Sequence, residues 1–69
     1  MFKFLISKEH DGKSLPEIIR YMEQTMGFEW NVTAYLASLD GKIIARNFMD
    51  RTLVHEGQIV KLFPMPAGG

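Results

Sequence analysis

The chain has 69 residues, 46% of them hydrophobic, which is enough for one small domain with a single core and argues against intrinsic disorder. Eight acidic and eight basic residues give a formal net charge of zero, and no Lys/Arg block occurs, so no nucleic-acid partner is expected. No apolar run approaches the ~20 residues of a membrane span, the N-terminus lacks signal-peptide features, and no cysteine is present. We therefore predict a cytoplasmic domain that binds neither nucleic acid nor membrane.

The first segment, residues 2–7, alternates between two faces, as a strand does. Phe2, Phe4 and Ile6 share one face, whereas Leu5 is an apolar residue on the other. Residues 8–13 are polar and turn-like, and they leave little room for a second strand. The pattern predicts one strand, and it leaves a second strand over 8–13 open.

A helix is predicted over residues 15–26. Ser14 suits the N-cap, Pro16 suits the first turn, and Glu17 stands where a capping box needs it. Apolar residues then recur at helical spacing, and Gly27 favours leaving the helix in a left-handed conformation. The methionines of this segment are interpreted as core residues rather than as a binding stripe.

A hairpin is predicted next, because Asp40-Gly41 stands between the apolar runs 32–39 and 42–46 and both turn positions tolerate positive φ. Asp40 is therefore interpreted as a turn residue rather than a catalytic carboxylate. A crossing segment over 46–51, which has room for one helical turn, and a turn at 55–57 lead into a final strand over 58–63. Trp30, after the helix, is expected to cover the edge of the core.

The outer face of the final strand is the first candidate binding surface. Ile59 and Phe63 share this face and would join Leu5 if the first and last strands are neighbours. An exposed apolar patch of this kind is typical of a partner surface. A loop or the Trp30 region covering the patch is an equally weighted alternative.

The two histidines, His10 and His55, are interpreted as solvated loop residues beside acidic neighbours. Their spacing does not suit a metal site. The sequence contains no serine in a nucleophile-elbow motif and no glycine-rich phosphate loop. The carboxylates are scattered over the turns and the expected solvent-exposed face of the helix. The sequence therefore predicts a protein that is not an enzyme by itself and that binds no cofactor or metal.

The last seven residues form the second candidate site. Pro64 and Pro66 prevent a helix or a central strand from continuing, so Met65 and its neighbours are expected to form a stiff extended arm. Gly68 and Gly69 have no side chain, so a terminal carboxylate can enter a slot too narrow for a Cβ. A frayed end is the alternative that the two glycines alone would favour.

Three segments together resemble the ubiquitin-like β-grasp sulfur carriers of the ThiS/MoaD group. The ending Phe63-Pro64-Met65-Pro66-Ala67-Gly68-Gly69 is similar to the end of the molybdopterin synthase small subunit. Residues 39–48 are similar to the Asn-Gly-x-x-Val-x-Arg-x-x-Trp region of ThiS, with Phe48 in place of the tryptophan. Residues 53–60 occupy the place of the family's Leu-x-Asp-Gly-Asp-x-Val, with Glu56-Gly57-Gln58 replacing Asp-Gly-Asp.

The resemblance implies an α+β fold, a ubiquitin-like β-grasp in which a mixed sheet of about four strands packs on one main helix. It divides the chain into a single domain over residues 1–63 and an extended, flexible Gly-Gly tail over residues 64–69. The family has a second strand before the helix, for which residues 8–13 offer little space.

The resemblance also implies a chemistry for the tail. An adenylating enzyme like ThiF or MoeB would use ATP and Mg²⁺ to activate the Gly69 carboxylate, and a persulfide donor would convert it to a thiocarboxylate. Gly68 would keep the tail thin enough for partner active sites. The partner-binding residues implied are Leu5, Ile59, Phe63, Pro64, Met65, Pro66 and Ala67.

The sulfur acceptor implied is a ThiG-like thiazole synthase of thiamin biosynthesis, favoured slightly by the 39–48 segment. A MoaE-like large subunit of molybdopterin synthase is the alternative, favoured by the tail, and a carrier for cysteine or another sulfur metabolite is a third, related option. Two functions of another class also remain open: a ubiquitin-like modifier that forms isopeptide bonds through Gly69, and a non-covalent β-grasp binding module.

Overall fold

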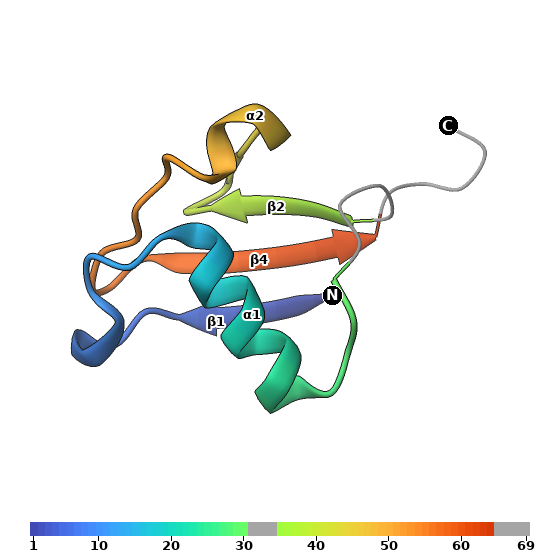
Figure 1. Ribbon diagram of the computed structural model, residues 1–69, viewed down its shortest axis with the longest axis horizontal. Coiled ribbons are helices and arrows are strands. Elements are labelled where there is room, and N and C mark those ends of the chain that lie inside the picture. The colour runs from blue at the N-terminus through green and yellow to red at the C-terminus, as the bar shows by residue number, and fades with distance from the viewer. Residues whose placement is uncertain (31–34, 65–69) are drawn as a thin grey trace.

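The computed structural model describes residues 1–30 and 35–64, in which a four-stranded sheet carries one long helix on one of its faces (Figure 1). The strands are β1 (Phe2–Leu5), β2 (Tyr35–Leu39), β3 (Lys42–Ile43) and β4 (Ile59–Pro64). The helices are the 3-10 turn η1 (Lys8–His10), the main helix α1 (Leu15–Met26) and the single turn α2 (Arg46–Met49). The chain is therefore a small α+β protein, as the sequence predicts.

The sheet has the strand order β1-β4-β2-β3, and β4 lies between β1 and β2 (Figure 1). Every pair of neighbouring strands is antiparallel, so the prediction of a mixed sheet is wrong. Residues 8–13 form η1 and a turn rather than a second strand. Without a returning strand, β1 itself must lead to the start of α1. Its last residue, Leu5, therefore lies opposite Ile59 at the start of β4, and β1 runs against β4.

The main helix α1 has the boundaries predicted from its sequence. The Oγ of Ser14 accepts a hydrogen bond from the backbone N–H of Glu17 at 3.3 Å, which satisfies one of the free donors of the first turn. The same hydroxyl donates to Oε1 of Glu17. At the other end, Gly27 has a φ of 74°, a left-handed conformation that side chains with a Cβ disfavour.

The hydrophobic core lies between α1 and the helix-facing side of the sheet. Val60 and Leu62 of β4 have no exposed surface, and they pack against the apolar stripe of α1. The buried apolar residues of the core are Ile6, Leu15, Ile18, Ile19, Met22, Ala37, Met49, Val54, Val60 and Leu62. Met22 of α1 is buried, as predicted, but Met26 in the last turn of the same helix is 37% exposed, so the prediction that both methionines belong to the core is wrong for Met26.

The β2–β3 hairpin turns at Asp40 and Gly41, which have φ values of 50° and 82° and confirm the predicted turn. Strand β3 is shorter than predicted, because α2 begins at Arg46 with Ala45 in the N-cap position. The predicted start of the hairpin at residues 32–34 lies outside the described residues.

Aromatic side chains cover the edge of the core at the end of the sheet where β1 begins. Phe28 stacks on Phe2 with ring centroids 4.0 Å apart, and Trp30 stacks on Tyr35 at 5.8 Å. The backbone N–H of Trp30 donates to Oε2 of Glu23 at 2.7 Å, which ties this connection to α1. Trp30 packs against the core, as the sequence predicts.

Candidate functional site

The sheet brings the three predicted partner-binding residues of the strands onto one face. Leu5 of β1 lies opposite Ile59 of β4, and Phe63 of β4 lies opposite Leu36 of β2. Residues directly opposite in an antiparallel pair project to the same side. That side is opposite α1, since the alternate residues Val60 and Leu62 are buried in the core. We call it the outer face.

The outer face is exposed at two of its apolar residues, while Ile59, Lys61 and Phe63 of β4 are half-buried and Ser38 of β2 is buried. The side chain of Leu5 is 61% exposed, and that of Ile43 in β3 is 50% exposed. Trp30 lies on the helix side, where it stacks on Tyr35, so it does not cover these residues. Of the two covers that the sequence leaves open, a loop and the Trp30 region, the position of Trp30 on the helix side excludes the second, and the binding of a partner to this face stays a prediction.

Two lysines occupy the centre of this face. Lys3 of β1 lies directly opposite Lys61 of β4, and Ser38 of β2 lies on the other side of Lys61. The outer face thus has three rows that cross the strands: Leu5 with Ile59, Lys3 with Lys61, and Leu36 with Phe63. The lysines were not predicted as a pair. The alternation of each strand places them on the outer face, but only the register brings them opposite each other.

The tail residues Met65, Pro66, Ala67, Gly68 and Gly69 lie outside the described residues. Pro64, predicted to begin the tail, is instead the last residue of β4 and pairs with Tyr35. A proline fits there because β1 pairs with β4 only as far as Leu62, so one flank of the strand end has no partner to receive an N–H. Strand β4 therefore includes the first residue of the predicted tail.

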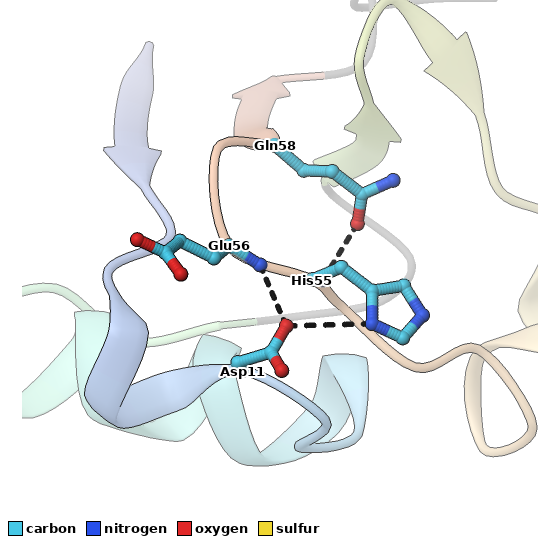
Figure 2. Close-up of polar contacts among 4 residues, drawn as sticks. All are labelled: Asp11, His55, Glu56 and Gln58. Atoms are coloured by element: carbon cyan, nitrogen blue, oxygen red, sulfur yellow. Dashed lines mark hydrogen bonds and ion pairs between the residues drawn. The ribbon is translucent and has the colours of Figure 1, made fainter.

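Asp11 joins two turns that are far apart in the sequence (Figure 2). Its Oδ1 accepts a hydrogen bond from the backbone N–H of Glu56 at 2.8 Å and lies 3.4 Å from Nδ1 of His55. The Asp11 and His55 side chains are 50% and 63% exposed. These two contacts link the turn after η1 to the turn before β4.

His10 differs from the prediction of a solvated loop residue. Its side chain is 6% exposed, with ring centroids 4.6 Å from Tyr21 and 5.5 Å from Phe4. Its Nδ1 lies 3.4 Å from Oγ of Ser7. The burial follows from η1, which turns the ring back towards β1 and α1, and a short polar segment gives no sign of this turn. His55 is exposed, as predicted.

Two side-chain oxygens accept hydrogen bonds from backbone N–H groups in and just before the start of β4. Oδ1 of Asp40 accepts from the backbone N–H of Ile59 at 2.8 Å, so this turn residue also fixes the start of the strand. Oε1 of Gln58 accepts from the backbone N–H of His55 at 2.7 Å (Figure 2). Gln58 stands where the resemblance leads one to expect an aspartate, and its amide oxygen supplies an acceptor without the charge.

Two hollows lie beside α1. One of about 230 Å³ is lined by His10, Lys13 and Arg20, among others. The other, of about 200 Å³, is lined by Trp30 and Met49. Both are smaller than the ~300–1,000 Å³ of common ligand pockets. Within residues 1–30 and 35–64, no group of three or more potential metal ligands occurs.

None of the helices that the structure describes is long and apolar enough to cross a membrane. No family model, curated protein or solved structure matches this chain. The candidate site is therefore described from the residues of this chain alone. It consists of the outer face and of strand β4, which leads towards the Gly-Gly segment.

Proposed function

We propose that this chain is a sulfur carrier of the ThiS/MoaD type, with a ubiquitin-like β-grasp fold and a reactive Gly69 carboxylate. The observation that carries the proposal is the position of β4. This strand is held on both sides by β1 and β2, and it runs directly into the Pro-Met-Pro-Ala-Gly-Gly segment. A strand anchored in this way supports an arm that enters a partner while the domain stays folded.

The proposed chemistry begins at the Gly69 carboxylate. An oxygen of the carboxylate attacks the α-phosphorus of ATP, pyrophosphate leaves, and an acyl adenylate forms in an activating enzyme that holds Mg²⁺. The terminal sulfur of a persulfide donor then attacks the acyl carbon, and AMP leaves. A second thiol cleaves the S–S bond of the resulting acyl disulfide, which leaves a thiocarboxylate on Gly69 and a disulfide on the donor side.

The residues of the tail account for the need to enter two active sites in turn. Gly68 and Gly69 present backbone without a Cβ, and Pro64 and Pro66 reduce the conformational freedom that binding must remove. Adenylation is required because a carboxylate is a poor electrophile. Because the proposed carrier holds its sulfur at the C-terminal carbonyl carbon, it needs no cysteine, and this chain contains none.

We assign the acceptor as a thiazole synthase, because residues 39–48 are similar to the corresponding ThiS region, and the compartment as the cytoplasm. The molybdopterin synthase large subunit is the alternative acceptor, supported by the Phe-Pro-x-x-Ala-Gly-Gly ending. In both pathways the chain is a protein co-substrate of its partner enzymes.

The proposal is tested by the intact mass of the purified protein after incubation with a ThiF-like or MoeB-like enzyme, Mg²⁺-ATP, a persulfide donor and a thiol. We expect replacement of one oxygen by one sulfur, mapped to Gly69 by fragmentation, and no replacement when ATP is omitted. The same spectrum establishes whether Gly69 ends the mature chain. A folded protein whose mass stays unchanged with both enzymes would contradict the proposal.

The outer face favours a second candidate, a non-covalent β-grasp binding module, because its exposed apolar residue Leu5 is available to a partner whether or not the tail reacts. A ubiquitin-like modifier would instead form isopeptide bonds between Gly69 and lysines of other proteins. The three functions have different products: a thiocarboxylate for a carrier, a ladder of conjugates for a modifier, and a complex without a new covalent bond for a binding module.

A further inference from the structure

The outer face contains a charge arrangement that the fold itself does not need. Lys3 and Lys61 lie directly opposite each other on antiparallel strands, where Cβ atoms are about 4.5–5.5 Å apart. Like charges in this arrangement destabilise a sheet. In the described part of the chain the one ion pair joins His55 and Asp11, so neither lysine is neutralised by a carboxylate there.

The flanking rows are apolar on both sides of the lysines. Leu5 and Ile59 form one row, and Leu36 and Phe63 form the other. An antiparallel sheet with a free face normally presents polar residues there. Alternate residues of one strand are about 7 Å apart, so the face repeats apolar, basic, apolar at this spacing along β4. This spacing is close to the rise of about 6 Å between residues i and i+4 of an α-helix.

We propose that the outer face is a docking surface for an acidic amphipathic helix of a partner protein. Carboxylates of the helix would pair with Lys3 and Lys61, and apolar residues one turn before and after would pack on the two apolar rows. The partner would supply both the missing cover of the sheet and the missing counter-charge. The inference does not depend on the chemistry of Gly69.

Charge also argues against two other occupants. A second copy of this chain, bound face to face, would place its own lysine pair against Lys3 and Lys61, which repel it. A nucleic acid or an anionic membrane would be drawn by a broad positive field, but the formal net charge of the chain is zero. A partner segment with an acidic group between apolar side chains matches the three rows better than a second copy of this chain, a nucleic acid or a membrane does.

The probe is a synthetic amphipathic helical peptide that carries leucine, glutamate and leucine on successive turns of one face. It is titrated into the full-length protein and followed by amide chemical shifts. We expect shifts at Lys3, Leu5, Ile59 and Lys61 and none along the exposed side of α1. A peptide with glutamine in place of each glutamate should bind at least about tenfold more weakly, and added salt should weaken the acidic peptide selectively.

The matched variants are the double substitutions Lys3→Gln/Lys61→Gln and Lys8→Gln/Lys13→Gln, which remove the same charge from different surfaces. The first should weaken binding of the acidic peptide about tenfold or more, and the second should leave it unchanged. Glutamine keeps the aliphatic stem and removes a repulsion, so the first variant should stay folded by circular dichroism.

Several outcomes would overturn the proposal. These are equal binding of the acidic and glutamine peptides, equal effects of the two double variants, or no binding of the acidic peptide by a folded protein. Preferential binding to anionic lipid vesicles, or a dimer in sedimentation that Lys3→Gln/Lys61→Gln stabilises, would assign the face to another occupant.

Discussion

The carboxylate of Asp11 accepts a hydrogen bond from the backbone N–H of Glu56 at 2.8 Å, which links two turns separated by 45 residues. Backbone hydrogen bonds join the same turns, from Gly12 to Val54 and from Val54 to Lys13, each at 2.8 Å. The connection from β1 to α1 is therefore fixed to the segment that leads into β4. This link lies at the end of the sheet where β4 begins, so it helps to position the strand that carries the candidate site.

Replacing Asp11 should separate the effect of its hydrogen bond to Glu56 from the effect of its contact with His55. Asp11→Ala leaves the Glu56 N–H without its acceptor and should lower the free energy of unfolding by about 1 kcal/mol. Asp11→Asn keeps an Oδ1 acceptor and loses only the exposed contact with His55, which should cost less than about 0.5 kcal/mol. Urea denaturation measures both values. Equal losses for the two variants would show that the charge, not the hydrogen bond, is the stabilising feature.

The two histidines form a second matched pair. His10→Ala removes a buried ring that packs against Tyr21 and Phe4, and it should lower the free energy of unfolding by about 1–3 kcal/mol. His55→Ala removes an exposed ring and should change this free energy by less than about 0.5 kcal/mol. Thermal unfolding at one fixed pH compares them. A destabilisation of similar size in both variants would contradict the burial of His10.

The two faces of the sheet should respond differently to the same truncation. Leu62→Ala creates a cavity in the core beneath α1 and should cost about 3 kcal/mol, enough to unfold a domain of this size in part or entirely. Leu5→Ala lies on the outer face, where Leu5 is 61% exposed, and should cost less than about 1 kcal/mol. The unfolding midpoints in urea give the comparison, and a larger loss for Leu5→Ala would reverse our assignment of the faces.

The tail substitution Gly68→Ala should affect the proposed reaction and not the fold. A Cβ on Gly68 would keep the carboxylate of Gly69 from reaching its position in the activating enzyme, and misplacement on this scale costs about 100-fold in rate. Ala67→Gly is the control, since it keeps the length of the tail and only adds flexibility. Rates of thiocarboxylate formation follow from intact mass over time. A Gly68→Ala protein that is converted at the normal rate would rule out a narrow entry slot.

The local elements follow from the sequence because their causes are local. Ser14, Glu17 and Gly27 cap α1, and these short-range contacts give the helix the boundaries that the sequence predicts. The positive φ values of Asp40 and Gly41 likewise depend on the two residues themselves. The alternation of β4 correctly separates the buried Val60 and Leu62 from the outer residues.

The direction of β1, the burial of His10 and the lysine pair were decided by the tertiary structure. Each depends on which segments become neighbours, and a hydrophobic pattern specifies the face of a strand but not its partner or register. The η1 turn replaced a second strand, so β1 had to run against β4 to reach α1. That same pairing set Lys3 opposite Lys61 and Leu5 opposite Ile59, and so assembled the outer face from two ends of the chain.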